Sequence, residues 1–219
     1  VVIPTHNRAH LLGRAVNSVL RQTFADFELI VVDDASTDDT ASLIGGFQDK
    51  RIKYTRHESN LGAPAARNTG ISNARGDYIG LLDDDDEWYP EKLEKQVLKF
   101  SEVSEAVGLI YSGHEVRESD GRLLRTYLPE VRGNVHMRLL LGTTIGSPTP
   151  LIRKACFQKV GLFDESLKSC QDWDMWKRIS DYYEFDYVPD ILAIGYRHEK
   201  QISSDFSSMI PGRTRNCSA

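Results

Sequence analysis

The sequence has few cysteines and no long apolar run. Its three cysteines (Cys156, Cys170 and Cys217) are too scattered for a disulfide framework or a zinc motif, so a reduced, cytosolic setting is expected. No apolar stretch approaches the roughly 20 residues that span a bilayer, and no signal peptide is recognisable. Because the chain begins at Val1 rather than Met, we expect it to be trimmed, so targeting or membrane segments could lie beyond either end.

Basic residues and glycine-rich loops are also scarce. The formal net charge of −5 argues against a general nucleic-acid surface. An acidic protein that binds an anionic ligand needs a metal or a few well-placed arginines. No Gly-x-Gly-x-x-Gly follows a strand, which argues against a dinucleotide oxidoreductase. With 40% hydrophobic and 27% charged residues among 219, the composition is that of a globular α/β domain.

Short β-rich runs alternate with helical patterns in the first half, which predicts βαβ units and a mainly parallel sheet. The second half predicts a strand, a hairpin with Asp120-Gly121 at its centre, and further helices. We therefore expect one domain over residues 1–219, with a nucleotide-binding half (1–105), an α+β acceptor-side half (106–200) and a tail (201–219). The expected strands are 1–3, 27–32, 52–56, 78–82 and 109–112, and the expected helices include 63–73, 135–141, 154–160, 172–182 and one that starts at Pro90.

Two acidic segments follow predicted buried strands. Asp33 and Asp34 end one strand, where a carboxylate either accepts a hydrogen bond from a base or ribose, or caps the turn before Ser36. Asp83 to Asp86 follow another strand, and four adjacent carboxylates repel one another unless a cation compensates. An extended backbone puts Asp83 and Asp85 on one side, Asp84 opposite, and lets Asp86 join at a turn. Oxygen ligands of this kind suit Mg²⁺ or Mn²⁺.

Two further segments carry residues suited to a sugar-phosphate ligand. Arg67 follows a Gly62–Pro64 helix start, and its guanidinium matches phosphate oxygens, although an arginine on a helix surface is common. Asp172 is expected to cap a helix that contains Trp173 and Trp176. These tryptophans are either core residues or a sugar platform; helical spacing lets at most one line a site with Asp172.

Taken together, these segments resemble the inverting family 2 glycosyltransferases of the GT-A fold. The resemblance covers roughly residues 1–200. In order, the matching segments are residues 2–8, 22–24, 27–36, 60–62 with 66–68, 83–86 with Trp88 and Pro90, and 172–176. The family usually has Tyr at His6 and Glu at Gln171, and the second difference removes a charge beside Asp172.

The resemblance implies a role for each matched residue. Pro4, Thr5 and Asp34 would contact the base and ribose, and Arg67 the diphosphate. Asp83 and Asp85 would serve ribose and metal, with Asp86 also at the metal. Asp172 would be the general base. His198 is either a late metal ligand or a surface histidine.

The implied reaction moves a sugar from a nucleoside-diphosphate donor, by the family's habit a UDP-sugar, to an acceptor hydroxyl with inversion. The implied cofactor is Mn²⁺ or Mg²⁺, and the acceptor is a carbohydrate or a lipid-linked carrier. A cytoplasmic location follows, with peripheral membrane association where the acceptor is lipid-linked. The alternatives are a catalytically silent nucleotide-sugar binding module, marked by Gln171, and a sugar-nucleotide pyrophosphorylase. The pyrophosphorylase is disfavoured because the Pro4–Arg8 loop contains no glycine.

Overall fold

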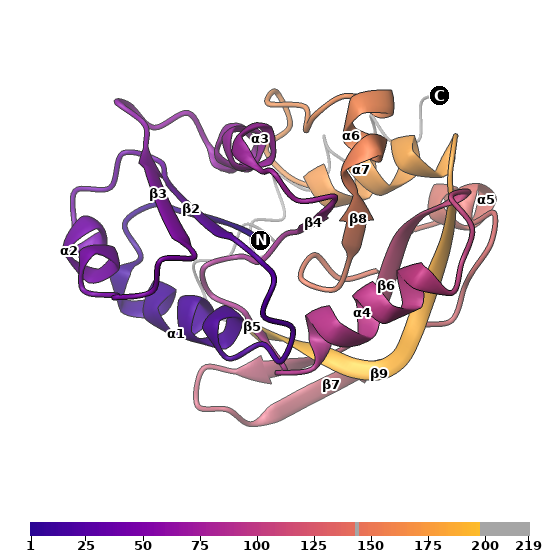
Figure 1. Cartoon of the computed structure of the whole chain (residues 1–219), viewed down its shortest axis with the longest axis horizontal. Coiled ribbons are helices and arrows are strands. Elements are labelled where there is room, and N and C mark those ends of the chain that lie inside the picture. The colour runs from indigo at the N-terminus through magenta and orange to yellow at the C-terminus, as the bar shows by residue number, and fades with distance from the viewer. Residues whose placement is uncertain (143–144, 198–219) are drawn as a thin grey trace.

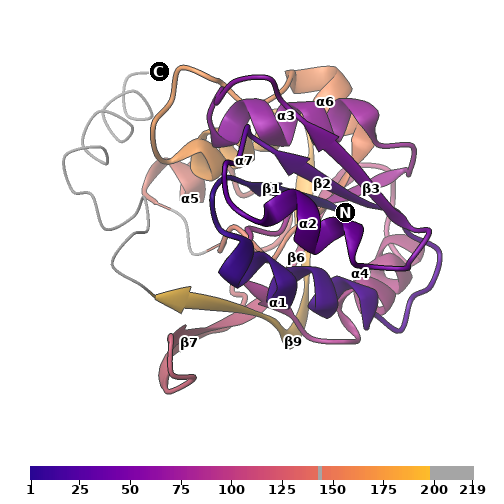
Figure 2. The same ribbon diagram turned by 90° about the vertical axis from the view of Figure 1, so that its left-hand side faces the viewer.

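The computed structural model describes residues 1–142 and 145–197. In this part of the chain, a three-stranded parallel sheet adjoins a six-stranded mixed sheet (Figures 1 and 2). The first sheet has the order β1-β2-β3. The second has the order β4-β8-β6-β9-β5, with β7 paired to β6. The two sheets meet where Leu81 forms a parallel bridge with Val2. The predicted α/β fold is confirmed.

The first half forms the predicted alternation of strands and helices. Its elements are β1 (Val2–Thr5), α1 (Ala9–Leu20), β2 (Leu29–Asp33), α2 (Thr40–Gly45), β3 (Ile52–Arg56), α3 (Ala63–Asn73) and β4 (Tyr78–Gly80). Helix α3 has the predicted bounds. Strand β4 differs from the prediction, because it ends at Gly80 and pairs antiparallel with β8, while the next residue, Leu81, forms the parallel bridge to β1.

The parallel sheet is buried on both faces, with α3 on one side and α1 on the other (Figure 1). Successive side chains of a strand point to opposite faces. One face therefore packs into one core cluster and the other face into a second. The first cluster includes Val2, Ile30 and Val32 with Ala66 and Ile71, and the second includes Ile3, Leu29 and Val31 with Leu12, Ala15, Val16 and Val19.

Helix α3 approaches β1 closely because residue 70 is glycine. A Cβ at Gly70 would lie 2.2 Å from Cγ1 of Val2, closer than side-chain atoms can come. The close contact fixes α3 beside the carboxyl edge of the parallel sheet. Arg67, one turn earlier on the same helix, is thereby held near the end of β1.

The second half supplies the mixed sheet and its covering helices. Its elements are β5 (Glu87–Trp88), α4 (Lys92–Ser101), β6 (Val107–Glu118), β7 (Leu123–Tyr127), α5 (His136–Leu140), β8 (Leu151–Arg153), α6 (Lys154–Val160), α7 (Gln171–Ser180) and β9 (Glu184–Arg197). The predicted hairpin is present as β6–β7. Pro90 does not begin a helix: α4 starts at Lys92, after a cap at Glu91.

Candidate active site

A cleft of about 570 Å³ opens where β1 and β2 end. Residues from both halves of the chain line it. The structure brings together every site residue that the sequence singles out within the described ranges: Pro4, Thr5, Asp34, Arg67, Asp83, Asp85, Asp86 and Asp172. His198, which the sequence offers as a late metal ligand, lies outside the described residues.

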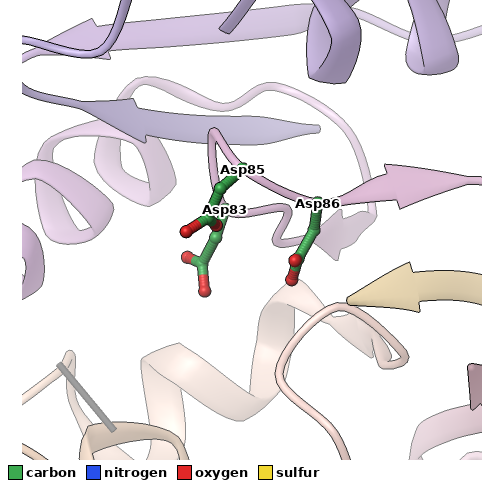
Figure 3. A group of neighbouring side chains, drawn as sticks. All are labelled: Asp83, Asp85 and Asp86. Atoms are coloured by element: carbon green, nitrogen blue, oxygen red, sulfur yellow. The ribbon is translucent and has the colours of Figure 1, made fainter. Parts of the chain in front are cut away.

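Three carboxylates converge on one side of the cleft. Asp83, Asp85 and Asp86 each offer an oxygen, and these oxygens lie within 4.8 Å of one another (Figure 3). The convergence comes from a tight turn, in which the Asp86 N–H donates to the Asp83 carbonyl oxygen at 3.1 Å. The sequence predicts an extended backbone here, and this prediction is wrong: a turn brings the carboxylates together. Burial, with Asp85 and Asp83 nearby, raises the pKa of Asp86 well above its ordinary value.

Asp84 is buried and does not belong to this cluster. Its carboxylate accepts hydrogen bonds from the Thr5 hydroxyl at 2.7 Å and from Nη1 of Arg8 at 3.0 Å. The same Arg8 nitrogen lies 3.0 Å from Oδ2 of Asp85. Burial raises the pKa of Asp84 to about 6, and the Arg8 guanidinium opposes this rise. Asp84 therefore anchors the acidic turn to the end of β1.

Arg67 connects the acidic turn to the far wall of the cleft. One guanidinium nitrogen donates to Oδ1 of Asp83 at 2.6 Å, and the other donates to Oε1 of Gln171 at 2.6 Å. The Arg67 side chain is only 11% exposed, and that of Asp83 is 28% exposed. A positive charge is thus held at the cleft surface between an acidic and a neutral acceptor.

The two carboxylates at the end of β2 have different functions. Asp33 accepts from the Ser36 N–H at 2.7 Å and from the Tyr54 hydroxyl, so it fulfils the turn-capping interpretation. Asp34 lines the cleft instead. Its Oδ2 accepts from the Gly62 N–H at 2.7 Å and its Oδ1 from the Leu61 N–H at 2.9 Å. Asp34 therefore orders the loop that precedes α3.

Asp172 is the second residue of α7 and not its cap. The cap position belongs to Cys170, whose φ of 56° puts it in the left-handed region. The Asp172 carboxylate accepts from the Trp173 N–H at 2.8 Å and borders the cleft. Burial raises its pKa; the Trp173 hydrogen bond and the nearby Arg67 charge oppose the rise. Asp172 is half-buried by its exposed surface, and a carboxylate with a raised pKa is a better proton acceptor than an ordinary aspartate.

Neither tryptophan of α7 lines the cleft, and the core interpretation is correct for Trp176, whereas Trp173 is half-buried. Trp176 is fully buried in the core. Trp173 donates its indole N–H to the Leu139 carbonyl at 2.7 Å.

Sequence reasoning missed several residues that line the cleft. These are His6, Arg8, Asn60, Gly62, Ala63, Ala66, Asp84, Ser147, Ser169, Cys170 and Gln171. Some lie in the segments singled out above: His6 follows Thr5, and Asp84 follows Asp83, so their positions in the sequence could have indicated them. Ser147 and Ser169 had no local signal, since the loops that carry them reach the cleft only through tertiary packing.

A comparison with known families identifies the chain. Residues 1–160 match the family described as "Glycosyl transferase family 2". The chain belongs to this family. The acidic turn lies within the matched residues, whereas Asp172 lies beyond them.

Its relatives include bacterial glycosyltransferases. An uncharacterized glycosyltransferase of Rickettsia prowazekii is 35% identical over 212 residues, which are 93% of this chain and 65% of that protein. A putative colanic acid biosynthesis glycosyl transferase, WcaA of Escherichia coli, is 33% identical over 93% of this chain and 75% of its own length. WfgD of Escherichia coli, a UDP-Glc:alpha-D-GlcNAc-diphosphoundecaprenol beta-1,3-glucosyltransferase, is 37% identical over 53% of this chain and 45% of its own length. The chain thus spans less than two thirds of the Rickettsia relative.

Two solved structures share the fold. TarS of S. aureus, solved with UDP-GlcNAc, superposes with a TM-score of 0.76 at 23% identity, over 94% of this chain and 60% of that one. A mannosyltransferase of Pyrobaculum calidifontis, in complex with GDP-Man and Mn²⁺, gives 0.73 at 16% identity, over 98% and 61%. The fold is accordingly of the GT-A type.

Proposed function

We propose that this chain transfers a sugar from a nucleoside-diphosphate donor, a UDP-sugar, to an acceptor hydroxyl with inversion. The observation that carries the proposal is one cleft that holds the acidic cluster, Arg67 and Asp172 together. Both halves of the chain contribute to this cleft, and a core cluster also spans them. That arrangement supports treating residues 1–105 and 106–200 as parts of a single domain.

Pro4, Thr5 and Asp34 would bind the nucleoside. An ionised carboxylate only accepts hydrogen bonds, so Asp34 would accept one from a base N–H or from a ribose hydroxyl. TarS is solved with UDP-GlcNAc, which makes uridine our choice of base.

The residues of the acidic turn fit a divalent cation. Asp85 and Asp86 would hold Mn²⁺ or Mg²⁺, with Asp83 shared between ribose and cation and His198 as a further ligand. Burial, and after it the neighbouring charges of Asp85 and Asp83, raise the pKa of Asp86, and a bound cation would favour its ionised form. The bound cation would neutralise charge that develops on the departing diphosphate. The Pyrobaculum neighbour is solved with Mn²⁺, which supports the choice of ion class.

Arg67 and Asp172 would carry the remaining steps. The Arg67 guanidinium would pair with diphosphate oxygens and help to stabilise their growing charge. Asp172 would take the proton from the acceptor hydroxyl, whose oxygen then attacks the anomeric carbon from the face opposite the leaving group. A single displacement through an oxocarbenium-like transition state inverts that carbon.

The acceptor would be a carbohydrate or a lipid-linked carrier. WfgD is named for a diphosphoundecaprenol-linked acceptor, and WcaA is named as a putative colanic acid biosynthesis enzyme, which supports an acceptor from polysaccharide or glycoconjugate synthesis. Among residues 1–142 and 145–197, no helix has the length and apolar character needed to cross a membrane. A cytoplasmic location with peripheral membrane contact is our proposal for the lipid-linked case.

A calorimetric screen tests this function. UDP-, GDP- and CDP-sugars are titrated into the protein with Mn²⁺ and again with a chelator. The donor that binds is then incubated with carbohydrate and lipid-linked acceptors, and the anomeric configuration of the product is read by NMR. An inverted product supports the proposal. Metal-dependent binding without transfer would favour the silent module, and exchange of the donor with diphosphate would favour a pyrophosphorylase.

A further inference from the structure

His57 lies behind the cleft and bridges two of the elements that form it. Directly after β3, its Nδ1 is 2.7 Å from Oδ1 of Asp34. Its Nε2 is 2.9 Å from the Thr69 hydroxyl of α3. The side chains of His57 and Asp34 are only 10% and 4% exposed. His57 is not among the residues that line the cleft, so its effect on a ligand must pass through Asp34 or α3.

The Asp34 carboxylate fixes the direction of the first hydrogen bond, and the resulting tautomer of the neutral ring fixes that of the second. An ionised carboxylate has no proton to donate, so Nδ1 of His57 carries the hydrogen. In the neutral imidazole, Nε2 is then an acceptor and receives the Thr69 hydroxyl proton. One tautomer therefore satisfies Asp34 and Thr69 together, and the imidazole ring is held from both ends.

This bridge determines how Asp34 presents its carboxylate. Oδ1 accepts from His57 and from the Leu61 N–H, and Oδ2 accepts from the Gly62 N–H. A carboxylate has about four acceptor positions, so acceptor capacity remains on Oδ2. Without the His57 contact, Oδ1 would keep a single protein donor and the carboxylate could rotate away from the cleft.

We propose that His57 is a positioning residue for nucleotide binding. It holds the Asp34 carboxylate toward the nucleoside and, through Thr69, ties it to the helix that carries Arg67. The nucleoside-binding and diphosphate-binding sides of the cleft are thereby kept in a fixed relation. The inference rests on the proposed function, because its ligand is the nucleotide part of the donor.

Two substitutions of His57 each keep one of its two hydrogen bonds and remove the other. In His57→Asn, the amide nitrogen takes the place of Nδ1 and can still donate to Asp34. In His57→Gln, the longer amide reaches the place of Nε2, so the contact with Thr69 is kept and the donor to Asp34 is lost. We expect the Kd for UMP to rise about tenfold in His57→Gln, the effect of one charge-assisted hydrogen bond, and about threefold at most in His57→Asn.

A measurement without nucleotide isolates the positioning role. Because Asp34 accepts from the Leu61 and Gly62 N–H groups, a misplaced carboxylate should speed hydrogen exchange at these two amides in His57→Gln. The matched control is His136→Gln, since Nδ1 of His136 also contacts a carboxylate, Asp181, at 2.9 Å. That pair borders no part of the cleft, so the control should leave UMP affinity and both amides unchanged.

Binding of UMP, and of UDP with Mn²⁺, decides the outcome by calorimetry. Equal losses for both nucleotides in His57→Gln, with faster exchange at residues 61 and 62, support the proposal. If the variant loses its thermal transition, Thr69→Val takes over the test, and an about threefold loss of UMP affinity is expected. Wild-type affinity in the folded variants would overturn the role of His57 alone. Failure of the wild-type protein to bind UMP, GMP, CMP or AMP would overturn the proposed function and this inference together.

Discussion

Arg67 donates a hydrogen bond to Oε1 of Gln171 across 2.6 Å, so the glutamine beside Asp172 supplies the oxygen that a glutamate would supply. The amide also donates to the Leu167 carbonyl at 3.0 Å, which fixes its orientation. Gln171 is buried. The position therefore keeps its acceptor while giving up its charge, and the substitution alone does not indicate a lost activity.

The first prediction concerns this neutral acceptor. Gln171→Glu should fold with a lowered Tm, because a carboxylate cannot donate to the Leu167 carbonyl. Its transfer rate should stay within about tenfold of the wild type, because both side chains offer an oxygen to Arg67. The rates and Tm values are measured side by side with the same donor and acceptor. Transfer that occurs only in Gln171→Glu would identify the natural chain as a silent binding module.

A second prediction concerns the acidic turn. A chelator should weaken UDP binding by at least about tenfold, since the phosphates then face the carboxylates without a cation between them. Asp85→Asn should reproduce that loss in the presence of Mn²⁺ without unfolding the protein. Calorimetry measures both effects. Asp190→Asn serves as the control, because Asp190 forms a partly exposed ion pair with Lys95 away from the cleft. Equal UDP affinity with and without the chelator would remove the metal from the proposal.

The third prediction concerns pH and a buried histidine outside the cleft. His114 stacks on Tyr127 with ring centroids 4.8 Å apart, and its Nδ1 finds no hydrogen-bond partner among the described residues. Burial lowers its pKa from 6.5 to about 4. The unfolded chain therefore gains a proton as the pH falls through 6.5, while the folded protein does not. Stability from this group is present above pH 6.5 and is lost as the pH falls toward 4.

Denaturant unfolding at pH 7 and pH 5 measures this loss. We expect the free energy of unfolding to fall by about 2 kcal/mol more in the wild type than in His114→Phe. Phenylalanine keeps a ring beside Tyr127 and cannot titrate. Comparing the two proteins at each pH cancels the contributions of the other titrating groups. An identical fall in both would show that His114 takes no part in the acid sensitivity.

The sequence predicted the first half of the fold better than the second. Strand β2 and helix α1 have strong local patterns, because an unbroken apolar run marks the strand and an apolar face at helical spacing marks the helix. Strand β9 was missed, although it is the longest strand among the described residues. It pairs with β6 about 75 residues earlier, and its pairing skips from Val188 to Ile191. Pro189 and Asp190, which fall in that gap, interrupt the alternation that would have marked a strand.

The same limit applies to the candidate site. Residues at strand ends were predictable, because the carboxyl edge of a parallel sheet gathers them whatever the details of the loops. The hydrogen-bond partners of these side chains were not predictable. Pairing of Arg8 with Asp84, or of His57 with Asp34, depends on distances between loops that no local pattern encodes. For the same reason, the sequence could not decide which of Asp33 and Asp34 caps the turn and which lines the cleft.

The last prediction concerns Asp172 and distinguishes an active glycosyltransferase from a module that only binds the donor. Asparagine keeps an oxygen for the Trp173 N–H but takes no proton, so Asp172→Asn should leave Tm and donor affinity near the wild-type values. Transfer should fall by at least about 100-fold, because general-base contributions are typically 10²–10⁴. Rates are measured at saturating donor with Mn²⁺. Since burial raises the pKa of Asp172, the wild-type rate should begin to fall on acidification at a pH above the ordinary 3.8 of an aspartate.

Asp174→Asn is the matched control for this prediction. Asp174 lies on the same helix, but its carboxylate pairs with Nε of Arg178 at 2.9 Å and does not border the cleft. Its substitution should cost at most about 0.5 kcal/mol of stability and leave transfer unchanged, as expected for a partly exposed i,i+4 ion pair. A large loss of Tm in Asp172→Asn would make Asp172 a structural residue of α7. Intact transfer in Asp172→Asn together with lost transfer in Asp174→Asn would assign the base to Asp174, which would require Arg178 to release it when the acceptor binds.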